Sequence, residues 1–97
     1  MTDSQLDFIS ELEKIIDSRR SAAGDTSYTR TLFDRGTPYI AQKVGEEAVE
    51  LSIAAVLGDR EKTVAEAADL VYHLLVLLQA NQLELGDVAR ELASRHR

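Results

Sequence analysis

One segment, residues 62–78, constrains the fold most, because apolar side chains occupy nearly all of its circumference at helical spacing. One broad face consists of Val64, Ala67, Ala68, Val71, Leu74, Leu75 and Leu78. Most of the remainder consists of Leu70, Tyr72, Val76 and Leu77. A helix that is apolar nearly all round is typical of a buried helix. Other helices, from this chain or from a second copy, must therefore cover it.

A narrow polar stripe interrupts this segment, formed by Lys62, Glu66, Asp69 and His73. Glu66 and Asp69 stand three residues apart, which places both acids on one side of the helix. A buried carboxylate without a partner is very costly, so a cation must neutralise the pair. The cations available are Lys43, Lys62 and His73, or an ion from outside the chain.

A second acidic group lies in QKVGEEAVEL, residues 42–51. Glu47 and Glu50, again three residues apart, flank the apolar face of this helical segment, and Lys43 projects between them. Glu46 lies farther out. Crowded carboxylates repel one another, so the pattern makes physical sense if a dication binds between two helices that face each other.

The remaining pattern predicts an all-α fold, with helices at about residues 4–20, 37–57, 59–81 and 85–95. Residues 21–36 are rich in Ser, Thr, Gly and Asp and predict a long loop. We expect a four-helix up-down chain that pairs with a second copy into a dimeric helical bundle, because so short a chain has a limited core.

Four residues mark the boundaries of the central helices. Thr37 is expected to be an N-cap and Pro38 to occupy the first helical position. Gly58 is expected to end that helix, and Asp59 to cap the next. The short connection makes the two helices antiparallel neighbours.

Length and charge limit the class of protein. The chain has 97 residues, so we expect residues 1–97 to form one domain. The net charge of −6 argues against nonspecific binding to nucleic acid. The N-terminal residues carry acids where a signal peptide needs bases, and no uninterrupted apolar run is long enough to span a membrane. We therefore expect a cytoplasmic protein.

The four acids Glu47, Glu50, Glu66 and Asp69 are the candidate metal ligands. An oxygen-only, strongly negative ligand set suits Mg²⁺, with Mn²⁺ as a substitute, rather than zinc or copper. The alternative is a solvated surface, because most such pairs of glutamates in helical proteins are exposed.

Four further residues carry the same ambiguity. Lys43, Arg30 and Arg35 are candidates for binding phosphate groups or ordinary surface cations, and His73 is a candidate for either phosphate binding or a structural hydrogen bond.

The residues QKVGEEAVE at 42–50, EAADLVYHLLVLL at 66–78 and the loop sequence SYTRTLF resemble phosphoribosyl-ATP pyrophosphohydrolase of histidine biosynthesis. The resemblance covers roughly residues 5–95. The spacing of the acids is shared with the wider all-α nucleotide pyrophosphohydrolases of the MazG type.

The resemblance implies a dimeric, Mg²⁺-dependent, all-α enzyme that hydrolyses phosphoribosyl-ATP to phosphoribosyl-AMP and pyrophosphate. It implies metal ligation by Glu47, Glu50, Glu66 and Asp69. For the attack of water on the phosphoanhydride, Glu46 or Glu50 is the candidate catalytic base. We expect the loop at 22–37 to cover the substrate.

Two alternatives stay open. A house-cleaning nucleoside triphosphate pyrophosphohydrolase of the MazG type would share the metal site. A non-catalytic helical dimerisation module would use its acids only at the surface or in salt bridges with Lys43 and Lys62.

Overall fold

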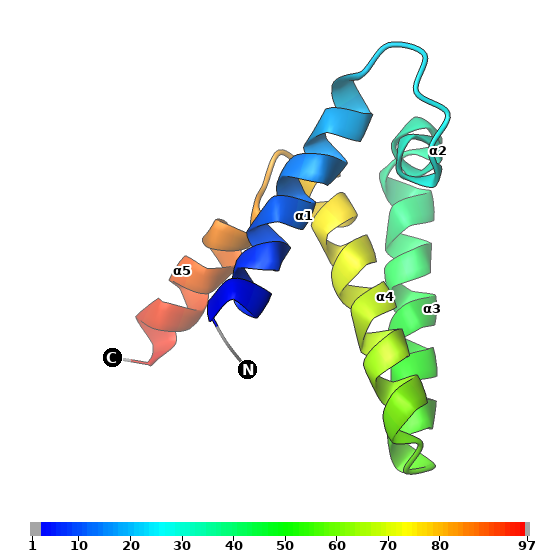
Figure 1. Ribbon diagram of the computed structural model, residues 1–97, viewed down its shortest axis with the longest axis vertical. Helices are drawn as coiled ribbons and strands as arrows, with labels where there is room; N and C mark the ends of the chain where they lie inside the picture. Colours follow the sequence, from blue (N-terminus) through cyan, green and yellow to red (C-terminus); the bar gives the residue numbers. More distant parts are fainter. Residues whose placement is uncertain (1–2, 97) are drawn as a thin grey trace.

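The computed structural model describes residues 3–96 and is all-helical over that range, which confirms the fold class. Five helices follow one another (Figure 1): α1 (Asp3–Ser21), α2 (Tyr28–Arg35), α3 (Thr37–Val56), α4 (Arg60–Ala80) and α5 (Leu85–Arg95). The prediction of four helices is wrong, because α2 lies within the segment expected to be a loop. The other four helices agree with the predicted ranges to within one or two residues.

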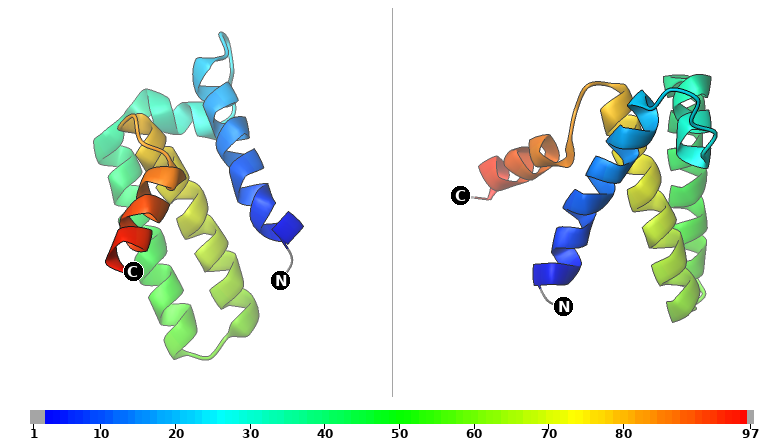
Figure 2. Two further views of the ribbon diagram at one scale, coloured as in Figure 1. Left: turned by 90° about the vertical axis from the view of Figure 1, so that its left-hand side faces the viewer. Right: turned by 45° about the horizontal axis from the view of Figure 1, so that its top comes forward.

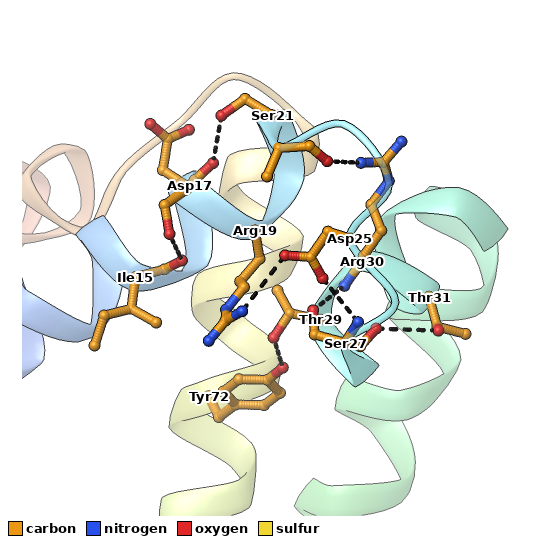
Figure 3. Close-up of polar contacts among 12 residues, drawn as sticks. Ile15, Asp17, Arg19, Ser21, Asp25, Ser27, Thr29, Arg30, Thr31 and Tyr72 are labelled. Carbon is orange, nitrogen blue, oxygen red and sulfur yellow. Dashed lines mark hydrogen bonds and ion pairs between the residues drawn. The ribbon is translucent and has the colours of Figure 1, made fainter.

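Helix α2 forms because polar side chains cap it and an apolar side chain anchors it. The Ser27 hydroxyl accepts a hydrogen bond from the Arg30 backbone N–H at 3.2 Å, and the Ser27 N–H donates to Asp25 Oδ1 at 2.7 Å (Figure 3). Hydrogen bonding from the side chain and the backbone of Ser27 lowers the pKa of Asp25. Leu32, on the opposite side, is fully buried. The Ser and Asp residues that favour a loop by composition therefore act here as the cap of a helix.

Gly36 is the single residue between α2 and α3. Its φ of 89° lies in the left-handed region, and its N–H reaches the carbonyl oxygens of Leu32 and Phe33, each at 3.2 Å. The predicted N-cap at Thr37 is wrong, because Gly36 occupies that position and Thr37 is already helical. Pro38 lies in the first turn of α3, where its missing N–H removes no helical hydrogen bond.

Helices α3 and α4 form an antiparallel hairpin, as predicted (Figures 1 and 2). Gly58 has a φ of 73° in the connecting turn. The Asp59 side chain then accepts a hydrogen bond from the Lys62 backbone N–H at 3.0 Å, which confirms it as the N-cap of α4. This short turn fixes how the two acidic pairs face each other.

The core lies at one end of this hairpin, where α1 and α2 pack against it (Figure 1). Its fully buried side chains come from all four helices and are Ile16, Leu32, Ile40, Leu75 and Val76. Burying one such side chain contributes roughly 1.5–3 kcal/mol. The end of α3 and the start of α4 lie beyond this core.

Helix α4 is not buried along its whole length within one chain, contrary to the expectation from its composition. Val64 near its start is 70% exposed, and Val56 at the end of α3 is 87% exposed. The reason is that α1 and α2 cover only the C-terminal half of α4. By length and composition α4 could also cross a membrane, but this is weak evidence, since core helices of soluble proteins pass the same test.

Helix α5 runs outward from the end of α4, away from α3 (Figure 2). Glu84 and Asp87 form a capping box at its start. The Leu85 N–H donates to Glu13 Oε2 of α1 at 2.8 Å, which ties the first turn of α5 to α1.

Candidate metal centre

Three carboxylates meet across the hairpin. Glu47 of α3 and Glu66 and Asp69 of α4 each offer an oxygen atom, and these oxygens all lie within 4.8 Å of one another. Glu66 and Asp69 share a side of α4 through their spacing of three residues. The antiparallel neighbour α3 presents Glu47 to them. The structure thus brings together three of the four acids expected to bind metal.

Two buried oxygen atoms make this acidic cluster of Glu47, Glu66 and Asp69 unusual. Glu47 is only 7% exposed. Its Oε2 and the Oε2 of Glu66 are buried and have no hydrogen-bond partner in the described part of the chain. Unpartnered carboxylate oxygens in such surroundings are costly. A cation with oxygen ligands would satisfy both atoms, so the donor set fits Mg²⁺ or Mn²⁺.

Glu50, the fourth expected ligand, is exposed and stands next to the cluster. Burial, the neighbouring Glu50 carboxyl group and the negative charges of Asp69 and Glu47 raise the pKa of Glu66. Glu66 therefore gives up its proton less readily than an ordinary glutamate, and a bound cation would oppose this shift.

Lys43 lies beside the cluster on α3. Its Nζ is 3.3 Å from Glu46 Oε1 and 3.9 Å from Glu47 Oε1. The hydrogen bond to Glu46 raises the pKa of Lys43, and hydrogen bonds from Gln42 and Lys43 lower the pKa of Glu46. Glu46 therefore pairs with Lys43, whereas Glu47 both contacts Lys43 and belongs to the acidic cluster.

His73, one turn beyond Asp69, has both ring nitrogens engaged. Nδ1 lies 2.7 Å from the Asp69 carbonyl oxygen, and Nε2 lies 2.9 Å from the Tyr28 hydroxyl of α2. The ring is only 5% exposed. In this arrangement His73 joins α2 to α4, and it has no free nitrogen to offer a phosphate group.

The two arginines of α2 point to local partners. Arg30 Nε lies 3.0 Å from Asp34 Oδ1, and its Nη1 donates to the Ala22 carbonyl oxygen at 2.7 Å. The Arg35 guanidinium carbon stands 3.7 Å from the centre of the Tyr39 ring. Neither arginine belongs to the acidic cluster in this structure.

Sequence reasoning did not identify Thr29 and Tyr72, which help to hold α2 against α4. Thr29 and Tyr72 share a short hydrogen bond between their hydroxyl groups (Figure 3), next to the bond between Tyr28 and His73. The signal available in the sequence was the pair of adjacent polar aromatic residues Tyr72 and His73 on an otherwise apolar helix.

A hollow of about 560 Å³ lies elsewhere, between α1 and the connection from α4 to α5. Its lining includes Glu13, Lys14, Arg20 and Gln79, and none of the residues of the acidic cluster. The acidic cluster is instead assigned by its chemistry, because buried, unpartnered carboxylates indicate a missing cation more directly than an open polar hollow does.

The chain also matches a known protein family. A family model described as "Phosphoribosyl-ATP pyrophosphohydrolase" matches residues 9–96, nearly the whole chain. This range contains all five helices except the first turns of α1.

Individual relatives agree with this match. The chain is 50% identical over 95 residues to the "Histidine biosynthesis bifunctional protein HisIE" of Vibrio vulnificus, covering 98% of this chain and 45% of the relative. It is 53% identical over 89 residues to the protein of the same name from Pasteurella multocida, covering 92% and 44%. The Campylobacter jejuni protein of that name is 51% identical over 90 residues, covering 93% and 44%. The chain thus spans less than half the length of these curated relatives.

Proposed function

The chain belongs to the phosphoribosyl-ATP pyrophosphohydrolase family, and we propose that it hydrolyses phosphoribosyl-ATP to phosphoribosyl-AMP and pyrophosphate, the second step of L-histidine biosynthesis. The observation that carries the proposal is the acidic cluster of Glu47, Glu66 and Asp69, which contains the buried Glu47 and lies within the matched range. Carboxylates cannot bind a polyanionic substrate by themselves. A cluster of them suits a substrate that arrives with, or meets, a divalent cation.

We propose Mg²⁺ as this cation, with Mn²⁺ as a substitute, held by Glu47, Glu66 and Asp69, with Glu50 as an additional ligand or a neighbour. The two buried Oε2 atoms without partners support this assignment. When bound, the ion would neutralise substrate phosphates and make a water molecule more acidic.

For the base that removes the proton from water, we favour Glu50 over Glu46. Glu50 is exposed, and its carboxyl group is close enough to Glu66 of the cluster to raise the pKa of Glu66. Glu46 is bound to Lys43 at 3.3 Å and to Gln42 at 3.2 Å, and its lowered pKa weakens it as a base. The water oxygen forms a new bond to the α-phosphorus and its proton passes to a Glu50 oxygen, while the bond between the α-phosphorus and the bridging oxygen breaks and pyrophosphate leaves.

Phosphate binding is assigned first to Lys43, which is the basic side chain in contact with the cluster. Arg30 and Arg35 remain proposed contacts for more distant phosphate groups. Because both are engaged locally, each would have to exchange a partner for the substrate. His73 is not a proposed phosphate contact, since both of its ring nitrogens are hydrogen-bonded.

The substrate assignment predicts that purified protein with Mg²⁺ converts phosphoribosyl-ATP to phosphoribosyl-AMP and releases one pyrophosphate per turnover. Removing the metal with EDTA is expected to lower the rate at least about 100-fold, and added Mn²⁺ should restore it. Chromatographic separation of the nucleotides measures the rate of this conversion. A clear preference for ATP or a modified free nucleoside triphosphate would instead favour the MazG-type alternative, and a protein inactive on all of them would favour the non-catalytic module.

We also propose that two copies pair through the uncovered end of the hairpin, in the cytoplasm. The support is the set of large apolar side chains exposed there: Val49, Ile53, Val56, Leu57 and Val64. Contiguous exposed apolar surface on a helical hairpin is typical of a protein interface. A second hairpin packed on it would complete the helical bundle expected from the sequence.

Replacing Val64 by Glu is expected to halve the mass of the particle in solution, because a charge would be buried in the proposed interface. Analytical ultracentrifugation measures the mass. Gln82→Glu is the matched control, since it adds the same single negative charge at an exposed polar position in the turn after α4, at the opposite end of that helix, and should keep the dimer. A wild-type chain that sediments as a monomer at micromolar concentration would contradict the pairing.

A further inference from the structure

Tyr28 is half exposed, at 51%, although several contacts hold it in place. Its hydroxyl is hydrogen-bonded to His73, and its ring lies nearly parallel to that of Tyr72, with centroids 6.2 Å and planes 22° apart. His73 is in turn hydrogen-bonded to the Asp69 carbonyl oxygen, which places Tyr28 beside the acidic cluster. The exposed part of the ring is therefore fixed in place next to the site proposed for the substrate phosphates.

The direction of the hydrogen bonds follows from the chemistry of the partners. The Asp69 carbonyl oxygen can only accept, so His73 Nδ1 must carry a hydrogen and donate to it across 2.7 Å. In the neutral imidazole Nε2 is then a bare acceptor. Tyr28 must therefore donate its own hydrogen to Nε2 across 2.9 Å.

This direction leaves the Tyr28 oxygen with lone pairs and no hydrogen to give. Phosphate oxygens are acceptors, so Tyr28 cannot bind them without losing its bond to His73. Amino and hydroxyl groups of a base or a sugar are donors and match the Tyr28 oxygen. The open part of the ring matches the flat face of a purine, because stacking on aromatic side chains contributes about 1–3 kcal/mol per base in proteins that bind nucleic acid.

We propose that Tyr28 recognises the nucleoside part of the substrate, by stacking on the base and by accepting a hydrogen bond from an amino or hydroxyl group. His73 is the positioning residue that orients the Tyr28 hydroxyl. The inference rests on the proposed function, since it assumes a nucleotide substrate. It divides the site into a phosphate side at Lys43 and the acidic cluster, and a nucleoside side at α2.

The test compares three variants, with phosphoribosyl-ATP as substrate and inorganic tripolyphosphate as an inhibitor that has no nucleoside. Tyr28→Leu is expected to raise KM about tenfold or more and to leave the inhibition constant of tripolyphosphate within about twofold. Tyr28→Phe keeps the ring and loses the oxygen, so a smaller rise in KM is expected. Thr29→Val is the matched control, because it breaks the neighbouring hydrogen bond to Tyr72 and should leave KM unchanged.

Two results would overturn the inference. Equal weakening of substrate and tripolyphosphate in Tyr28→Leu would show that Tyr28 only supports the fold, as would an equal rise in KM in Thr29→Val. If the wild-type chain does not hydrolyse phosphoribosyl-ATP, the proposed function fails separately. Calorimetric binding of ATP and of tripolyphosphate to the same variants then decides the role of Tyr28, because a selective loss of ATP binding supports it and a parallel loss contradicts it.

Discussion

Replacing Glu47 by Gln is expected to lower turnover of phosphoribosyl-ATP at least about 100-fold while the chain remains folded. Glu47 is the most buried member of the acidic cluster and carries an oxygen without a hydrogen-bond partner. The substitution keeps the size of the side chain and removes the charge that a divalent cation needs. Glutamine also relieves the repulsion from Glu66 and Asp69, so the metal-free variant should be no less stable than the wild type.

Thermal unfolding with and without Mg²⁺ separates this effect from a loss of structure. At a metal concentration about 100 times the dissociation constant, binding to the folded state stabilises it by about 2.7 kcal/mol, which raises Tm by on the order of 10 °C for a chain of this size. The wild type should show this increase and Glu47→Gln should not. Glu61→Gln is the control, an identical change at an exposed acid in the first turn of α4, and should keep both activity and the increase in Tm. A Glu47→Gln protein that unfolds without metal at a much lower temperature would mean that Glu47 is structural.

The acidic pairs could be predicted because their geometry is local. The spacing of Glu66 and Asp69 fixes their common side of α4, and the turn at Gly58 fixes the antiparallel neighbour. These two rules are enough to bring Glu47 opposite them. Position along a helix and the length of a turn are properties that a sequence carries directly.

Helix α2 could not be predicted by the same rules. Its eight residues are too short to be stable alone, so it depends on contacts with residues far along the chain. Thr29 and Tyr28 bond to Tyr72 and His73, more than forty positions away. Composition alone favours a loop at this point, and tertiary hydrogen bonds decide otherwise.

The expectation of a buried α4 also depends on more than one chain. Its apolar circumference indicates a helix covered on all sides, but α1 and α2 reach only half of it. In the single chain, Val64 and its apolar neighbours on the hairpin are exposed, although the composition of α4 predicts that they are buried. The proposed second copy would cover these side chains, so that α4 is half covered in one chain and buried in the dimer.

Replacing Glu66 by Gln is expected to have opposite effects on stability and activity. Turnover should fall at least about 100-fold, since a ligand of the metal is lost. The metal-free protein should become more stable at neutral pH, because burial, Glu50 and the charges of Asp69 and Glu47 all disfavour an ionised Glu66. Glutamine has no charge to bury and adds no repulsion against these carboxylates.

The direction in which this difference in stability changes with pH follows from the raised pKa of Glu66. The pKa of Glu66 in the folded chain is raised above its ordinary value of 4.5, so the folded state binds more protons than the unfolded state between the two values. The stability that protonated Glu66 contributes is fully present below pH 4.5 and is lost as the pH rises through the raised value. Glu66→Gln does not lose this stability, because glutamine does not ionise.

The difference in Tm between Glu66→Gln and wild type in EDTA should therefore be small at about pH 4 and grow to a plateau toward about pH 8. Metal affinity of the wild type should rise over the same interval, because the cation must displace that proton. A Tm difference that is the same at every pH would show that the pKa of Glu66 does not change on folding and would contradict this prediction.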